Sequence, residues 1–392
     1  MLIRQIQQSA WREFLRMLRD PNLVLVLFVA PLAYTALYGS IYWNKAEVDV
    51  PVDVVDRDHS TLSRRLWRDI DALQDVRVAR CGGEETISRD RLERGIVHGI
   101  LLIPEGYEEA LKTGRRAVVH LTLSPGRLLV LSDIGIGISR TVATNGARVT
   151  GSVLARQGVP VFQNSDYAQP IGVTWTPMFN PWLTYGDMIL PALLAVILIQ
   201  LAFIGSAAAT AAEWGNGGWV EVFQRQGQRT GAVVTGKAVM FIAVFLIFSA
   251  LVGCTVVPLF DIHVGGSVAL LFLLLLFAFA AAVLMGMFVG SYFRHRLTVF
   301  VVLGFSSYPL FMLSGYAWPG AQLAPWLRTV SRLLPTTPFL RGIGTLTQMG
   351  NGMPQLLPQL LNLGALILLF GATAWWRFRG IARKAISADP HV

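Results

Sequence analysis

The chain has 392 residues, of which 53% are hydrophobic and 15% are charged, whereas a soluble domain has about 25% charged residues. Its net charge is +9, and the hydrophobic parts carry the whole excess, because residues 44–182 hold 17 basic and 17 acidic side chains. A nucleic-acid-binding protein would carry such an excess on a water-soluble face, so no nucleic-acid partner is expected. The two cysteines, Cys81 and Cys254, fall in a polar and an apolar region and predict no disulfide framework.

The N-terminal part predicts an amphipathic helix followed by a membrane anchor. Residues 1–22 carry four arginines between apolar side chains and are expected to form a cytoplasmic helix. The apolar run at 23–43 has roughly 20 residues, whereas the core of a cleaved signal peptide has about 7–15. The run also lacks a small-residue cleavage site, so we expect an uncleaved first transmembrane helix.

Residues 44–182 alternate strand-like and helix-like segments, which indicates a small α/β domain. A helical segment then returns the chain to the membrane. The strands are expected at 51–56, 76–80, 97–103 and 117–123, and the helices at 60–73, 84–95, 105–112 and 128–157.

Five further apolar runs predict a transmembrane domain over residues 183–376, followed by a tail at 377–392. About 20 apolar residues cross a membrane as a helix, and no globular core of this size could bury five such runs. The predicted fold is therefore an α-helical membrane protein with six transmembrane helices and an α/β domain inserted between the first and second. The five runs are 183–211, 238–257, 266–290, 297–314 and 356–376.

The distribution of basic residues predicts the orientation in the membrane. With the N-terminus inside, 13 basic residues flank the cytoplasmic ends of the helices, whereas the short outer loops hold only Arg328, Arg332 and Arg341. We therefore expect a bacterial inner-membrane protein with cytoplasmic termini and with residues 44–182 in the periplasm.

Two short motifs suggest catalysis but have simpler interpretations. Residues 231–237 spell most of a phosphate-binding loop, yet Ala238 stands where the motif needs Ser or Thr, and no strand precedes it. The glycine and lysine at 236 and 237 fit the start of a membrane helix better. Asp58, His59 and Ser60 are adjacent and point apart, so a strand end and a helix N-cap are expected rather than a triad. The histidines show no metal-ligand spacing, and no enzyme site is predicted.

Charged residues within the spans bear on the source of energy. Asp187 lies near the outer end of its helix, either as a solvated terminus or on a substrate path, and no ionisable residue lies at mid-depth. Tyr308, Pro309 and Ser314 are further candidates for the translocation path. Active transport by this chain would therefore draw its energy from a partner.

The loop after the second span carries two tryptophans, a phenylalanine and carboxylates. It is expected to form either an interfacial helix or a docking element for a soluble subunit. Its candidate residues are Glu213, Trp214, Gly217, Trp219, Glu221 and Phe223, followed by Gly236 and Lys237 at the start of the next helix.

Three regions together resemble a type 2 ABC transporter permease over nearly the full length. Residues 57–65 (RDHSTLSRR) and 99–104 resemble the external domain of the longer members. The loop resembles the coupling pattern Glu-Trp-Glu-x-Gly-Thr, with Gly215 and Gly218 replacing the second glutamate and the threonine. Residues 313–319, with Pro325 to Leu327 and Pro335, resemble the outer re-entrant segment.

The resemblance implies a coupling loop at 212–232, an outer re-entrant segment at 315–355 and an assembly of two permeases with two cytoplasmic ATPase subunits. The second permease would be an identical copy or a paralogue, ATP and Mg²⁺ would bind to the ATPase, and this chain would hold no cofactor. A drug-like, lipidic or other amphipathic cargo is implied, taken from the cytoplasm or the membrane lipid. A periplasmic adaptor docking on the external domain is a further hypothesis, and a membrane-anchored sensor or scaffold is the alternative function.

Overall fold

The fold consists of a helical unit, built from both ends of the chain, and an α/β unit that lies between them in the sequence. The two units are described separately. The computed structural model describes residues 2–41, 48–123, 128–156, 185–214, 218–225, 229–259, 265–316, 320–350 and 352–387.

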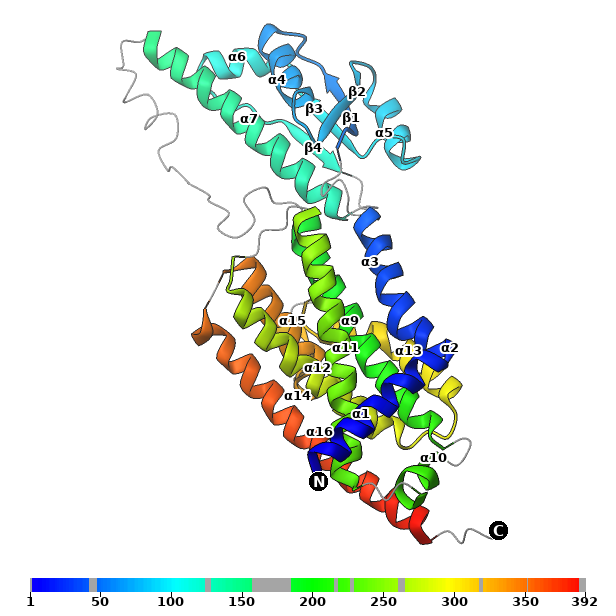
Figure 1. The fold of residues 1–392 in the computed structure, drawn as a ribbon. Coiled ribbons are helices and arrows are strands. Elements are labelled where there is room, and N and C mark those ends of the chain that lie inside the picture. The colour runs from blue at the N-terminus through cyan, green and yellow to red at the C-terminus, as the bar shows by residue number, and fades with distance from the viewer. Residues whose placement is uncertain are drawn as a thin grey trace. The chain divides into compact units, whose positions relative to one another are not determined.

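Six helices of the described residues are long and apolar enough to cross a membrane, as the sequence predicts. They are Pro21–Ile41, Ile189–Ala212, Thr230–Leu259, Val268–Gly290, Arg296–Leu313 and Met353–Lys384. Figure 1 labels the elements of the helical unit, which are α1 (Leu2–Arg19), α2 (Pro21–Val24), the π-helical turn η1 (Leu25–Val29), α3 (Ala30–Ile41), α9 (Tyr185–Ala212), α10 (Gly218–Val220), η3 (Glu221–Arg225), α11 (Thr230–Leu259), α12 (Val268–Gly290), α13 (Arg296–Leu313), η4 (Gly320–Gln322), α14 (Pro325–Arg332), α15 (Thr336–Ile343), η5 (Gly344–Gln348) and α16 (Met353–Ser387).

Helix α9 is the most enclosed of the six. In its most apolar stretch 72% of the residues are buried, against 11% to 33% in the other five. Small residues allow this, because Cβ atoms on Gly286 and Gly290 of α12 would collide with Ser206 and Ala207 of α9. Helices in lipid associate through such close backbone contacts. This packing places α9 at the centre of the bundle.

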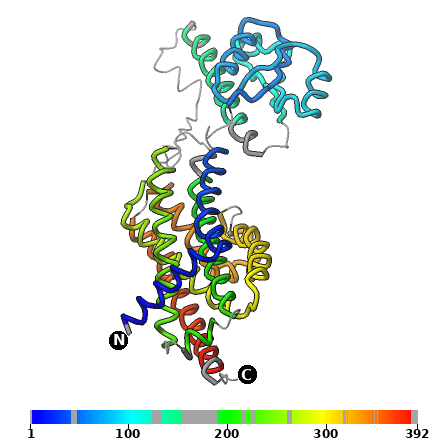
Figure 2. Tube along the Cα trace, turned by 45° about the vertical axis from the view of Figure 1, so that its right-hand side comes forward, coloured from blue at the N-terminus to red at the C-terminus, as the bar shows by residue number. Residues whose placement is uncertain are grey.

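The N-terminal helix α1 lies against the start of α11 at one end of the bundle (Figure 1). Both views place the beginning of α1, the short helix α10 and the last turns of α16 at this same end (Figures 1 and 2). Three segments that are distant in sequence therefore lie at the same end of the bundle.

The α/β unit has a four-stranded mixed sheet in the order β2-β1-β3-β4. The pairs β1–β2 and β1–β3 are parallel, and β3–β4 is antiparallel. In the β1–β3 pair, Val52 lies opposite Gly99. Its elements are β1 (Val50–Asp56), α4 (Thr61–Asp71), β2 (Val76–Cys81), α5 (Glu85–Glu93), β3 (Gly99–Ile103), α6 (Tyr107–Lys112), β4 (His120–Leu123) and α7 (Leu128–Arg156). The predicted alternation of strands and helices is confirmed.

Alternation along β1 gives the sheet two packed faces. Val52 and Val54 join the core formed with α4 and α7, while the buried carboxylate of Asp53 pairs with Arg91 of α5 at 3.0 Å. The hydroxyl of Ser60 accepts a hydrogen bond from the backbone N–H of Ser63 at 3.0 Å and caps α4. The segment around Ser60 is thus a strand end and an N-cap, as expected.

Candidate functional site

Five charged side chains form a cluster where α1, the end of α9 and the start of α11 meet. We call Arg12, Glu13, Arg16, Glu213 and Lys237 the ion cluster. The ammonium group of Lys237 lies 2.6 Å from Oε2 of Glu13 and 2.9 Å from Oε1 of Glu213. The same Glu213 oxygen lies 3.1 Å from Nη2 of Arg12 and 2.5 Å from Nη1 of Arg16. Two carboxylates and three cations therefore hold three separate segments together.

Helical spacing explains how α1 contributes to the ion cluster. Ser9, Glu13 and Met17 follow one another at intervals of four and are all fully buried, so they share the face that packs on the bundle. Gly236 of α11 permits the approach, because a Cβ atom there would lie 2.6 Å from the Cβ of Ser9 and 2.8 Å from the carbonyl oxygen of Ile6. The next residue, Lys237, then reaches Glu13.

Burial makes the electrostatics of the ion cluster strong. The side chains of Glu13, Glu213 and Lys237 are 0%, 3% and 1% exposed. Burial by itself raises the pKa of the Glu213 carboxyl, but the positive charges of Lys237, Arg16 and Arg12 outweigh this and hold its pKa below the ordinary value. The carboxylate therefore stays ionised and keeps its partners at neutral pH.

Aromatic side chains enclose one side of the ion cluster. The ring of Trp219 in α10 stacks on the ring of Phe223, with 5.8 Å between the ring centroids. It packs edge to face with the ring of Phe378 in α16, with 5.0 Å between the centroids. The Lys237 ammonium lies 5.9 Å from the centre of the Trp219 ring, within range of a cation–π attraction. Gly218 is required beside them, because a Cβ atom there would collide with the Glu213 carboxylate. Helix α10 is thereby packed on α16 and lies beside Lys237 of α11.

Comparisons with known proteins agree with this architecture. A family model described as ABC-2 family transporter protein matches residues 23–376. The chain belongs to this family. Two relatives with the name probable multidrug ABC transporter permease YbhS, from Escherichia coli strain K12 and from Escherichia coli O157:H7, are each 21% identical over 384 residues. The match covers 95% of this chain and 96% of each relative.

Membership in the ABC-2 family, together with the six apolar helices, makes this chain a multi-pass membrane protein and a permease subunit of an ABC transporter. Permeases of such systems are not themselves ATPases, and the family implies an ATPase partner. The resemblance drawn from the loop and the outer segment is confirmed at the level of the family.

The structure of this ABC-2 permease places the loop residues that the sequence singles out in two groups. Trp214, Trp219 and Phe223 form one aromatic group beside Glu213, whereas Glu221 is exposed. Gly217 lies outside the described residues, and so does Gly215. Residues 231–237 belong to α11, so the phosphate-loop interpretation fails and the start of a membrane helix is confirmed.

Lys237, Arg12 and Arg16 have charged partners that the sequence does not predict. Lys237 is predicted as a lysine at a helix start, and the structure buries it between two carboxylates. Arg12 and Arg16 are counted as flanking cations, yet both also pair with Glu213. A charged contact from Glu213 to an ATPase remains a prediction, and in this structure the carboxylate is engaged inside the bundle.

The candidates for a translocation path belong to α13 and to the first turn of α9, and none of them is a member of the ion cluster. Tyr308 on α13 is 69% exposed, and Pro309 follows it inside the same helix. Ser314 is buried and donates a hydrogen bond to the carbonyl oxygen of Phe311 at 2.6 Å. Asp187 belongs to the first turn of α9, and its side chain lies outside the described part. Tyr308, Pro309 and Ser314 thus lie on α13 or at its C-cap, and a role of these residues in a translocation path remains a prediction.

Sequence reasoning missed two buried polar residues. In the sequence Glu13 stands between Arg12 and Arg16, on a helix expected to be amphipathic. Its spacing of four from Ser9 and Met17 is the signal that places it on the packed face. Gln200 is polar but not ionisable, so a criterion of charge at mid-depth does not identify it. It occupies the middle of the span Ile189–Ala212 and is 7% exposed.

Proposed function

We propose that this chain is the membrane subunit of an ATP-driven exporter and that its ion cluster passes the motion of a separate ATPase subunit to the helices. The observation that carries this is the buried set of ion pairs joining α1, the end of α9 and the start of α11. Segments joined by several short ion pairs move together, so a push on α10 that passes through Trp219 to Lys237 would reach α1, the end of α9 and α11 at once.

The position of the basic residues supports docking of the ATPase at this end. Arginines on α1, the arginine at the start of α13 and the basic residues in the last turns of α16 gather at the end that contains α10. Basic residues favour the cytoplasmic side, where ATP is available. We therefore assign both termini to the cytoplasm and the α/β unit, after one crossing, to the periplasm of a bacterial inner membrane.

An amphipathic, drug-like or lipidic cargo fits the apolar helical unit. The relatives named as probable multidrug permeases support the drug-like class. We further propose that a second permease, identical or paralogous, completes the membrane part and that the α/β unit docks a periplasmic adaptor. ATP and Mg²⁺ would bind to the ATPase subunit alone.

Affinity purification of the full chain from its native membranes in mild detergent tests this proposal. We expect an ABC ATPase subunit to co-purify with the wild-type chain. We expect less of it with Trp219→Ala, which unpacks α10, and an unchanged amount with the control Trp67→Ala in the α/β unit. If no ATPase co-purifies with the wild-type chain, the export proposal fails. If the Trp67 variant loses the ATPase as much as the Trp219 variant does, the ion-cluster end is not its docking site.

A further inference from the structure

Gln200 carries an unused polar group at the centre of the helical unit. It is 7% exposed, and neither the nitrogen nor the oxygen of its carboxamide has a hydrogen-bond partner among the described residues. An amide that is buried without partners costs several kcal/mol, and lipid offers no compensation. Polar side chains at such depth face the bundle interior or a cavity and mark ligand or transport paths.

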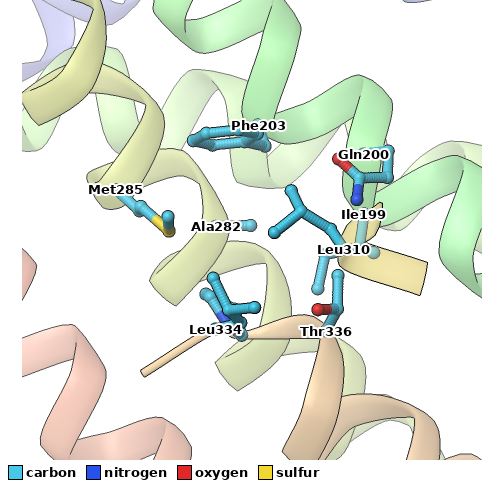
Figure 3. Close-up of a pocket in the computed structure, with 9 residues that line it drawn as sticks. Ile199, Gln200, Phe203, Ala282, Met285, Leu310, Leu334 and Thr336 are labelled. Carbon is cyan, nitrogen blue, oxygen red and sulfur yellow. The ribbon is translucent and has the colours of Figure 1, made fainter. Parts of the chain in front are cut away.

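A second unpartnered polar group lines the same cavity. Thr336, the first residue of α15, is 6% exposed, and its hydroxyl has no partner within the described part of the chain. Gln200 and Thr336 reach the cavity from different elements, and Leu310 of α13 lies between them in the close-up (Figure 3). Two independent polar groups therefore point to one ligand.

The size and lining of the cavity define the chemistry of that ligand. The volume is about 20 Å³, which is sufficient for one water molecule or one hydroxyl group. No described residue of the lining is charged, and the others are mainly apolar, such as Phe203 and Met285. An amide offers both donors and an acceptor, and a hydroxyl offers both as well. The fitting group is therefore neutral and both donates and accepts hydrogen bonds.

We propose that Gln200 and Thr336 form a binding site for one neutral, hydroxyl-sized group at mid-depth in the membrane. Two sources supply this chemistry, a water molecule or the hydroxyl of an amphipathic molecule that enters between α9 and α13. Only the second source, in which that molecule is cargo, rests on the proposed export function.

A double-mutant cycle tests whether the two residues share one bound group. Gln200→Leu and Thr336→Val remove the polar atoms with little change of shape, and the thermal unfolding midpoint is measured on the full chain in detergent. If one group bridges both residues, the double variant loses less than the sum of the two single losses. Thr347→Val is the matched control, because this threonine is 7% exposed and its hydroxyl already donates to the carbonyl oxygen of Ile343 at 2.8 Å.

A pair of probes distinguishes the two sources. We expect 1-hexanol to raise the unfolding midpoint of the wild-type chain more than 1-chlorohexane, which lacks the hydroxyl, and we expect this difference to vanish in Gln200→Leu and persist in Thr347→Val. If the midpoint losses are not additive but 1-hexanol and 1-chlorohexane have the same effect, the occupant is water. Additive losses without a probe difference overturn the proposal, as does a midpoint of Gln200→Leu equal to that of the wild type. The measurements need no ATPase, so they are independent of the coupling proposal.

Discussion

Removing the buried ammonium group of Lys237 is expected to destabilise the helical unit strongly. The group lies 2.6 Å and 2.9 Å from the carboxylates of Glu13 and Glu213. With an effective dielectric constant of about 20, each pair has a gross attraction of about 6 kcal/mol, and desolvation offsets much of it. Lys237→Met keeps most of the volume but leaves Glu13 with Arg12 at 3.9 Å as its nearest cation. Stranding a buried charge costs about 3–5 kcal/mol.

The assay is unfolding of the full chain in detergent, compared with two further variants. Glu13→Gln combined with Lys237→Met removes the stranded charge as well and should recover a substantial part of the loss, because Glu213 retains both arginines. Arg94→Gln breaks an exposed pair with Asp90, whose side chains are 68% and 54% exposed, and should cost less than about 1 kcal/mol. A Lys237→Met loss as small as that of Arg94→Gln would refute the reasoning, and so would a double variant that loses the sum of its parts.

Three further outcomes are expected. Gly236→Leu should cost about 1–3 kcal/mol of unfolding free energy, because its Cβ would lie 2.8 Å from an α1 carbonyl oxygen. It should also make α1 accessible to protease, and protease resistance of α1 equal to that of the wild type would contradict this. Hydrogen bonding to Lys112 lowers the pKa of Glu108 from 4.5 to about 2, so its stabilisation, present above pH 4.5, should fade as the pH falls towards 2. The denaturant midpoint of the α/β unit should therefore decrease between pH 4.5 and 2. In Glu108→Gln this decrease should be smaller, because the contribution of Glu108 is absent at every pH. In a Cys254→Ser background, an impermeant maleimide should label the exposed Cys81 in spheroplasts, and labelling only after lysis would reverse the orientation. The rate should increase with pH because the thiolate is the reactive form, and partial burial, which raises the thiol pKa, moves this increase to higher pH.

The membrane helices and the α/β unit follow largely from periodicity. Leu128–Arg156 and Thr61–Asp71 lie within two residues of their predicted bounds, because helix signals such as the Ser60 cap are local. Span lengths were harder to predict. The last helix extends to Ser387, beyond the predicted end at 376, since arginines in its final turns remain compatible with a helix outside the apolar layer.

The ion cluster could not be predicted from local sequence. Glu13 and Lys237 are 224 positions apart, and their pairing depends on the crossing of α1 over α11 that Gly236 permits. The sequence contains both residues but no signal of their proximity. The domain boundaries at 44–182 and 183–376, the re-entrant segment at 315–355 and the absence of a cofactor remain predictions.

ATP hydrolysis by the purified chain, alone and together with the ATPase that co-purifies with it, tests the central claim most directly. Both samples would be reconstituted in lipid nanodiscs at matched permease concentration with Mg²⁺ present. We predict no hydrolysis above empty nanodiscs for the chain alone and clear hydrolysis when the second subunit is present. Hydrolysis by the chain alone, abolished by a substitution within the chain itself, would contradict the account.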